Sequence, residues 1–599
     1  MADTVAKRSE IPQEKRWAVE DLYPCDAAWE EDYQRVAALI GEGEKYKGHL
    51  GDSAQTLQEY LDFADQLDQE IEKIYMYAHL NMDVDTTDVT YQTMRMKAQT
   101  LLVRAEEENA FAQPEIMAIP EETLASWRAE TPGLSVYDRY FTVLLRRREH
   151  TRSREVEELL AGASEMASAP SDTFTMLNNA DLTFPKIVGE DGQETEVTHG
   201  RYISLMESAD RNVRKAAFES MYSSFGQFAN TIASTFSANV KQAMFFARAR
   251  GYSSTRAMYL APGNIPEEVY DNLIDVVHEA LPSMYRYVAL RKKLLGVEEL
   301  HMYDVYAPII PECAMKVTFE EAKETILEAL KPMGEEYLAA LREGFENRWI
   351  DACENAGKRS GAYCNGGTIG HPYVLMTYKD TLDSMFTLAH EMGHAMHSYF
   401  SMKVQPHQTA GYLIFVAEVA STCNEILLTR YLLSHTEDRA QKAYIINHFL
   451  DSFKGTLFRQ TMFAEFEMIA HRRAEAGEAL TADGLNRIYY GLNEKYFGPD
   501  MKVDQEIRLE WARIPHFYTP FYVYQYATGI SAAAALSERI LTLGEEGVKD
   551  YMKFLTGGGS ADPIDLLKLA GVDMSKKEPV EAAAKLFEDM LDQLIELVG

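Results

Sequence analysis

The stretch Thr387–Ser398 reads TLAHEMGHAMHS and contains the pattern His-Glu-x-x-His. Positions i and i+4 of a helix lie one turn apart on the same face, so His390 and His394 can direct two imidazoles at one metal ion. Glu391 points about 100° further round the helix, where a general base for a metal-bound water belongs. Apolar residues on the adjacent face predict that one side of this helix packs while the next faces a cleft.

A third metal ligand is expected from residues 411–420, which read GYLIFVAEVA. A carboxylate in so apolar a helix is costly unless it is paired or bound to a metal. Pro406 and Gly411 break the connection between the two helices, and a helix hairpin would return Glu418 to the histidines. Two histidines, one glutamate and a water are a common catalytic zinc set. The alternative is an ion pair of Glu418 with a nearby base such as Arg430.

His397 and two carboxylates are further candidates around the metal. His397 lies at i+7 from His390, about 10 Å along the helix axis, so we expect it beside the site, with a ligand role as the alternative. Asp383 lies seven residues before His390 and on the same face. Glu425 follows Glu418 by the same interval. Each carboxylate could orient a metal ligand, or be a solvated surface charge.

Composition bounds the class of protein and its partners. A chain of 599 residues and 67.9 kDa should fold as more than one lobe, and 46% hydrophobic with 25% charged residues is typical of soluble globular proteins. A net charge of -34 argues against nucleic acid and anionic membranes as partners. The N-terminus lacks an apolar signal core, and no apolar run reaches the length of a membrane span. The five scattered cysteines form no CxxC pair, which predicts reduced thiols in a cytoplasm: Cys25, Cys313, Cys353, Cys364 and Cys423.

Hydrophobic periodicity predicts a mostly helical chain with two short β segments. Residues 1–180 show helical spacing almost throughout. Residues 181–188 and 194–197 predict a hairpin at a lobe boundary. Residues 360–364 and 371–378 predict a second small sheet just before the metal helix. A strand that opens with proline suits a sheet edge, which could pair with an extended peptide; an ordinary hairpin is the alternative.

An aromatic run near the C-terminus, residues 511–529, reads WARIPHFYTPFYVYQYATG. Phenol and imidazole groups can stabilise a developing oxyanion as neutral hydrogen-bond donors. If Pro520 opens a helix, Tyr522 and Tyr526 share a face and Tyr524 points elsewhere. An aromatic core helix is the alternative interpretation.

These motifs resemble those of the oligoendopeptidase F group of the thimet-oligopeptidase-like zinc metallopeptidases. The similarity rests on Thr387–Ser398, on the helix of Glu418 and on residues 516–529, with weaker matches at Trp17–Tyr23 and Tyr303–Pro308. The resemblance implies a mainly α, elongated fold with two lobes around a deep channel and a small sheet near the active site.

The resemblance also divides the chain and assigns its residues. An N-terminal helical lobe is expected over residues 1–199 and a catalytic domain over 200–599. One Zn²⁺ per chain would be held by His390, His394 and Glu418, with Glu391 as the base. His516 and a tyrosine, with Tyr526 favoured, would stabilise the oxyanion. The residues expected to contact substrate are Tyr522, Tyr524 and Tyr373.

The function implied is zinc-dependent hydrolysis of internal bonds in short peptides, with no nucleic-acid or membrane partner. A cytoplasmic monomer or small homo-oligomer is expected. One rival is a zinc carboxypeptidase or dipeptidase with the same ligands, which needs a cationic anchor for a free carboxylate, such as Arg513. The other rival is a non-catalytic helical peptide-binding scaffold, against which the presence of Glu391 argues.

Overall fold

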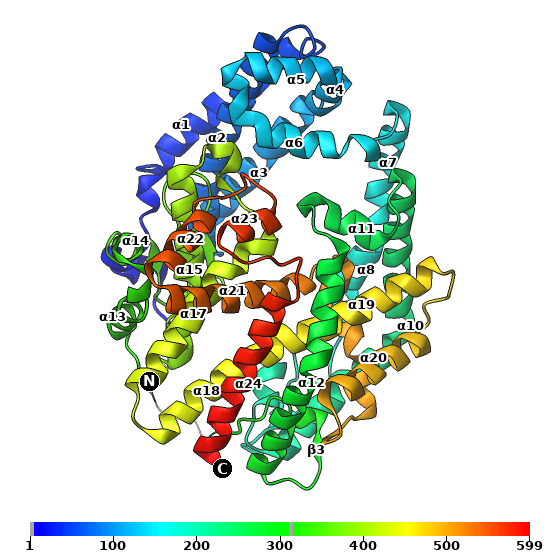
Figure 1. Cartoon of the computed structure of the whole chain (residues 1–599), viewed down its shortest axis with the longest axis vertical. Helices are drawn as coiled ribbons and strands as arrows, with labels where there is room; N and C mark the ends of the chain where they lie inside the picture. Colours follow the sequence, from blue (N-terminus) through cyan, green and yellow to red (C-terminus); the bar gives the residue numbers. More distant parts are fainter. Residues whose placement is uncertain (1–4, 311–314) are drawn as a thin grey trace. The chain divides into compact units, whose positions relative to one another are not determined.

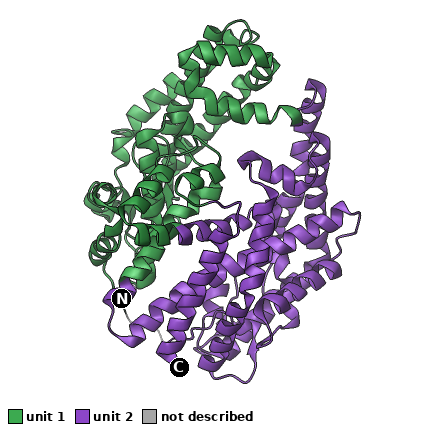
Figure 2. Cartoon of the chain, in the orientation of Figure 1, with its two compact units in different colours: residues 1–149, 315–431, 536–572 green, residues 150–314, 432–535, 573–599 purple. Residues whose placement is uncertain are grey.

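A computed structural model describes residues 5–310 and 315–599 and shows a mainly α chain with only short strands, which confirms the predicted fold class. The chain divides into two compact units that interleave along the sequence (Figure 2). The predicted boundary at residues 199 and 200 and the predicted channel remain predictions. Unit 1 comprises residues 1–149, 315–431 and 536–572, and unit 2 comprises residues 150–314, 432–535 and 573–599.

Unit 1 carries the metal motif and a small sheet (Figure 1). Its last long helix, α17, runs a few residues past the unit boundary. In chain order its elements are α1 (Asp26–Leu39), α2 (Ala54–Val84), α3 (Val89–Asn109), α4 (Ala112–Ala118), α5 (Glu121–Glu130), α6 (Asp138–Arg146), α13 (Phe319–Ala329), α14 (Glu335–Glu346), β4 (Ile350–Asp351), β5 (Tyr363–Asn365), β6 (Tyr373–Leu375), α15 (Leu382–Val404), α16 (His407–Ala410), α17 (Ile414–His435), α22 (Glu545–Leu555) and α23 (Pro563–Leu569).

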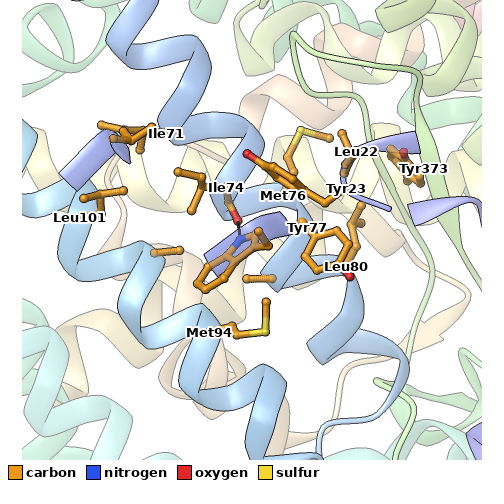
Figure 3. Packing of buried hydrophobic residues seen from close by; sticks show 14 of the residues in the cluster. Leu22, Tyr23, Ile71, Ile74, Met76, Tyr77, Leu80, Met94, Leu101 and Tyr373 are labelled. Atoms are coloured by element: carbon orange, nitrogen blue, oxygen red, sulfur yellow. Dashed lines mark hydrogen bonds between the residues drawn. The ribbon is translucent and has the colours of Figure 1, made fainter. Parts of the chain in front are cut away.

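The core of unit 1 includes a cluster formed by α1, α2 and α3, which β6 also joins (Figure 3). Ile71 and Ile74 of α2 recur at helical spacing and are buried, as the periodicity of this segment requires. The indole of Trp29 donates a 2.8 Å hydrogen bond to the carbonyl oxygen of Ile74, so its one polar atom is satisfied inside the cluster. Tyr373 contributes its ring from β6 and is fully buried.

The sheet of unit 1 has the strand order β4-β6-β5. β6 pairs in parallel with β4 and antiparallel with β5, so the strand predicted to form the sheet edge lies at its centre. The edge prediction is wrong because Pro372 lies just before the paired residues, whose own N–H groups can still donate to a neighbouring strand. The N–H of Val374, for example, donates to the carbonyl oxygen of Trp349. The edge next to the metal helix is β5, which packs on α15.

Helices α15 and α17 form the predicted hairpin. Thr381 caps the N-terminus of α15 by accepting a hydrogen bond from the backbone N–H of Ser384, and Pro406 follows the C-cap at the other end. Gly393 sets how closely the two helices approach. A Cβ at this position would lie 2.5 Å from Cα of Ser421 and 2.7 Å from the carbonyl oxygen of Ala420. Only glycine therefore lets α17 pack directly on the metal helix.

Unit 2 is helical (Figure 1). It also contains two short two-stranded sheets. The predicted hairpin is present but short: β1 (Ile187–Val188) pairs with β2 (Glu194–Thr195), and a π-helical turn, Leu177–Asp181, precedes it. α21 continues past the unit boundary. In chain order the elements are α7 (Arg154–Ala167), α8 (Ala169–Met176), β1 (Ile187–Val188), β2 (Glu194–Thr195), α9 (His199–Met206), α10 (Arg211–Arg250), α11 (Thr255–Leu260), α12 (Glu267–Leu295), β3 (Leu300–His301), α18 (Arg439–Phe453), α19 (Arg459–Glu475), α20 (Ala482–Phe497), β7 (Met501–Lys502), α21 (Tyr524–Leu543) and α24 (Glu578–Val598).

Two sequence expectations concern membranes and cysteines. Within the described residues, no helix combines the length and the hydropathy that a membrane crossing requires. Four of the five cysteines are described, and each is a free thiol. Cys313 lies outside the described residues.

Candidate metal centre

Three side chains of unit 1 converge in the way the sequence predicts. His390 and His394 project from one face of α15, and Glu418 projects from the first turns of α17. Nε2 of His390 lies 3.2 Å from Nε2 of His394. Oε2 of Glu418 lies 3.4 Å from the first of these nitrogens and 3.6 Å from the second. The three residues form a group of potential metal ligands.

These separations fit one tetrahedral ion. Ligand atoms about 2.0–2.1 Å from a tetrahedral centre lie about 3.3 Å from one another. The three observed distances of 3.2, 3.4 and 3.6 Å bracket that value. Two imidazole nitrogens and one carboxylate oxygen leave one position of the tetrahedron for a water or a substrate oxygen, which is the arrangement of a catalytic metal site.

Each of the ligands is oriented by a second contact. Nδ1 of His390 lies 2.5 Å from Oε1 of Glu425, which follows Glu418 by seven residues on α17. His394 makes a hydrogen bond with the backbone of Ala417. The hydroxyl of Ser421 donates a 3.3 Å hydrogen bond to Oε2 of Glu418. Such outer contacts fix the tautomer of a histidine and the direction of its free nitrogen.

The electrostatics of the group favour a bound cation. Burial alone would lower the pKa of His390, but hydrogen bonds to Glu418 and Glu425 raise it well above its ordinary value. Burial and the neighbouring charge of His390 lower the pKa of His394 to about 4. Burial would raise the pKa of Glu418, yet the bond from His390 and the charges of both histidines lower it to about 2. The carboxylates that favour a proton on His390 would also favour a metal cation at this position.

Glu391 lies beside the ligands and outside their group. It is buried, with 6% of its surface exposed, and its Oε2 has no hydrogen-bond partner among the described residues. Burial raises the pKa of Glu391 to about 7. The charge of His390 opposes this rise, and the charges of Glu418 and Glu425 add to it. Cys364 of β5 lies close enough for the charge of Glu391 to add to the effect of burial on the thiol pKa. β5 thus lies close to the prospective base.

The other candidates of the metal helix have different surroundings. His397 is buried and stacks on Tyr412 with ring centres 3.8 Å apart, so it lines the core beside the site and is absent from the ligand group. Burial lowers its pKa to about 3. Asp383 is exposed in the first turn of α15, whereas Glu425 contacts His390. Of the two carboxylates with matching intervals, only Glu425 therefore touches a ligand.

In unit 2, three of the predicted aromatic residues form one cluster. The ring centres of His516 and Tyr522 lie 5.9 Å apart in near-parallel planes. Tyr526 closes the triangle, 6.1 Å from His516 and 5.6 Å from Tyr522. His516 is exposed and both tyrosines are half-buried.

Two of the tyrosines predicted to contact substrate are buried in the core. Tyr524 opens α21 and is 2% exposed, packed against Tyr270 with ring centres 5.0 Å apart. Tyr373 has no exposed surface, and its hydroxyl donates to the carbonyl of Ala18. Both rings pack in the core. For the aromatic run, packing in the core was the alternative interpretation of the sequence. Pro520 also does not open the helix, which begins four residues later.

One buried acid near the aromatic cluster was not among the predicted residues. Glu467 of α19 is 1% exposed and accepts a 2.8 Å hydrogen bond from the backbone N–H of Phe521. The signal that could have found it is an acidic side chain in the apolar helical stretch 462–470, which is the same signal that indicated Glu418.

Comparisons with known proteins agree with this geometry. The model of Peptidase family M3 matches residues 204–586, and that of Oligopeptidase F matches residues 115–184. Oligopeptidase PepF of Bacillus subtilis (strain 168) is 49% identical over 597 residues, which cover 100% of this chain and 89% of the relative. Group B oligopeptidase PepB of Streptococcus agalactiae is 42% identical over 592 residues, which cover 99% of this chain and 98% of the relative.

A solved structure supports the same assignment. The crystal structure of oligoendopeptidase-F from Enterococcus faecium is 42% identical and superposes with a TM-score of 0.76, covering 96% of this chain and 99% of that one. The family match extends over more than half of the chain and includes the His390, His394 and Glu418 group. The chain therefore belongs to peptidase family M3, in the oligoendopeptidase F group, and is a metallopeptidase.

Proposed function

We propose that this metallopeptidase is a zinc enzyme of the cytoplasm that hydrolyses internal bonds of short peptides. The observation that carries the proposal is the tetrahedral spacing of His390, His394 and Glu418, with Glu391 on the same helix as the two histidines. The names of the relatives, oligopeptidase and oligoendopeptidase F, support the choice of short peptides.

Zinc is the metal that this donor set suits best. Two imidazole nitrogens and one carboxylate oxygen with an open fourth position form a common catalytic zinc site. Harder ions such as Mg²⁺ and Ca²⁺ prefer oxygen ligands and higher coordination numbers. A zinc ion bound here would supply a Lewis acid that polarises a peptide carbonyl and makes water more acidic.

Glu391 performs the proton transfers in this proposal. It would take a proton from the attacking water and return that proton to the nitrogen of the leaving amine. A carboxylate whose pKa is raised to about 7 by burial is suited to both steps near neutral pH. Glu425 would hold the ring of His390 so that its Nε2 stays directed at the metal position.

We assign oxyanion stabilisation to the aromatic cluster of unit 2. The imidazole of His516 and the phenol of Tyr526 each offer a hydrogen-bond donor in a half-open environment. Partial burial of the ring lowers the pKa of His516, which favours its neutral form near neutral pH. Neutral donors stabilise developing negative charge without capturing the proton that Glu391 must carry. Tyr522, whose ring contacts both, is assigned to binding of the peptide.

The peptide backbone has a docking edge in unit 1. β5 is an edge strand that packs on the metal helix, so an extended peptide could pair with it by strand addition. This moves the proposed pairing from β6, whose two sides are both occupied, to Tyr363–Asn365.

The exopeptidase rival depended on a free cation that could anchor a peptide carboxylate. Arg513 is engaged elsewhere, because its guanidinium lies 4.5 Å from the ring centre of Tyr202. Internal cleavage therefore remains the better proposal.

The decisive experiment is mass spectrometry of one set of peptides, supplied with free ends and with both ends blocked. The enzyme is treated with a chelator and then restored with zinc. Internal cleavage of the blocked peptides that chelation abolishes and zinc restores would support the proposal. Trimming of free ends with blocked peptides untouched would favour the exopeptidase. The same sequence within a folded protein should resist cleavage, because exposing an extended segment there costs local unfolding.

A further inference from the structure

The aromatic cluster of unit 2 depends on an unusual turn just before Tyr522. Phe521 has a φ of 56°, in the left-handed region that residues other than glycine rarely enter. A bulky side chain in this conformation persists only where the surrounding structure holds it. Phe521 lies between the 3₁₀ turn Pro515–Tyr518, which contains His516, and the start of α21 at Tyr524.

Two kinds of contact hold Phe521 in place. Its ring is buried and lies between neighbouring rings, 4.7 Å from that of His471 and 5.8 Å from that of Tyr270, measured between centres. Its backbone N–H donates the 2.8 Å hydrogen bond to Oε1 of Glu467. The rings fix where the side chain lies, and the hydrogen bond fixes the plane of the peptide group.

Burying the carboxyl group of Glu467 costs folding free energy. It is 1% exposed, and its Oε2 has no hydrogen-bond partner in the described part of the chain. Burial raises its pKa to about 8, against the effect of the bond from Phe521. A carboxyl group that is costly to bury needs a compensating interaction, and the bond to Phe521 is the one the structure gives it.

We propose that Glu467 is a positioning residue for catalysis. By accepting the N–H of Phe521 it holds the left-handed turn that places Tyr522 and Tyr526 beside His516. This inference rests on the proposed role of those rings in oxyanion stabilisation and substrate binding. It concerns the orientation of donors, on which Glu467 acts through the backbone of Phe521.

Two substitutions separate the hydrogen bond from burial and charge. Glu467→Gln keeps a carbonyl oxygen that can accept from Phe521, and it removes the ionisable group. Glu467→Met keeps the length of the side chain and removes the acceptor. Glu465→Met is the matched control, since Glu465 lies on the same helix and is also buried but bonds to His278, Lys495 and Tyr496.

The readouts are kcat and KM on an end-blocked peptide, bound zinc, and hydrogen exchange of the segment that contains the Phe521 amide. For Glu467→Met we expect kcat to fall roughly 10–100-fold, within the range that misplaced catalytic groups cost, with little change in KM or zinc content. The Phe521 amide should exchange faster. Glu467→Gln and Glu465→Met should keep kcat within about threefold of the wild type, since both leave the Phe521 hydrogen bond intact.

Several outcomes would overturn the inference. They are an unchanged kcat and exchange rate in Glu467→Met, a Glu467→Gln variant as impaired as Glu467→Met, or a loss of kcat in Glu465→Met equal to that in Glu467→Met. If Glu467→Met does not fold, Glu467→Asp withdraws the acceptor by one methylene and must show the same fall in kcat and the same faster exchange.

A separate variant distinguishes this inference from the proposed function. Tyr526→Phe removes the donor and leaves the turn intact, so its kcat tests the oxyanion role alone. If Tyr526→Phe and His516→Ala both keep full kcat, the proposed oxyanion role fails. The exchange rate of the Phe521 amide then still decides whether Glu467 holds the turn.

Discussion

Nδ1 of His390 lies 2.5 Å from Oε1 of Glu425, and the opposite nitrogen of the same ring lies 3.4 Å from Oε2 of Glu418. One imidazole therefore connects a ligand carboxylate and an orienting carboxylate, both on α17 and seven residues apart. That interval brings both side chains to the same face of α17. The metal site is consequently a property of the helix pair α15 and α17.

Glu425→Gln should weaken zinc binding without unfolding the chain. Loss of an orienting carboxylate typically costs about 10–100-fold in metal affinity. Competition with a graded chelator measures this affinity. Asp383→Asn is the control, because Asp383 is exposed and does not contact the ligands. Equal zinc affinity in the two variants would contradict the orienting role of Glu425.

Glu391→Gln should keep zinc and lose activity. The glutamine has the same shape and cannot accept a proton, and general base catalysis contributes about 10²–10⁴-fold. We expect kcat to fall by that factor while the zinc content stays equal to that of the wild type. A variant with nearly full kcat would exclude Glu391 as the base.

Glu418→Ala and His397→Ala should have opposite effects on the metal. Removing Glu418 takes away one of three donors, so zinc should be lost on dialysis. His397 stacks on Tyr412 and lies outside the ligand group, so its removal should leave a cavity and a less stable but zinc-loaded chain. Zinc retained by Glu418→Ala and lost by His397→Ala would reverse the assignment.

The sequence reveals the metal centre more completely than the aromatic cluster, for a physical reason. His390, His394 and Glu391 follow from helical periodicity alone, and Glu418 follows from the cost of an acid in an apolar helix. The start of α21 has no such local signal. It depends on Phe521, which adopts a left-handed φ because Glu467, 54 residues earlier, holds its N–H.

The position of β6 in its sheet also depends on distant residues. Pro372 indicates an edge strand, but the pairing that places β6 at the centre comes from β4, more than twenty residues earlier. Local sequence rules describe one strand and cannot name its second neighbour. The burial of Tyr373 follows from that pairing, so local sequence rules could not predict it either.

Gly393→Ala should disturb the metal site through helix packing. The added methyl would meet the backbone of Ala420 and Ser421 at under 3 Å and push α17 away from α15. We expect destabilisation of about 1–3 kcal/mol and weaker zinc binding, because Glu418 moves with α17. Gly491→Ala on the exposed face of α20 is the control, since nothing lies within 4 Å of its Cβ position. That change should be neutral or stabilising by up to about 1 kcal/mol. Thermal unfolding and chelator competition check both variants.

His471 should make unit 2 sensitive to acid. It is 1% exposed on α19, its Nδ1 lies 2.9 Å from the hydroxyl of Thr255, and burial lowers its pKa to about 3 from an ordinary value of 6.5. Between pH 3 and 6.5 the unfolded chain therefore binds a proton that the folded chain does not. Stability rises with pH wherever the unfolded state binds more protons, so this histidine costs no stability above pH 6.5 and an increasing amount below it.

His471→Gln removes that dependence while keeping a side chain that can bond to Thr255. At pH 7.5 the variant should be less stable than the wild type, since an amide fits the site less well than the ring that packs on Phe521. At pH 5 the wild type has lost roughly 2 kcal/mol through this one group, 1.5 pH units at about 1.36 kcal/mol each, and the variant has not. The difference in unfolding free energy between the two chains, measured in urea at several pH values, should therefore shrink by about that amount. A difference that stays constant from pH 7.5 to pH 5 would show that His471 takes up its proton equally in the folded and unfolded chain.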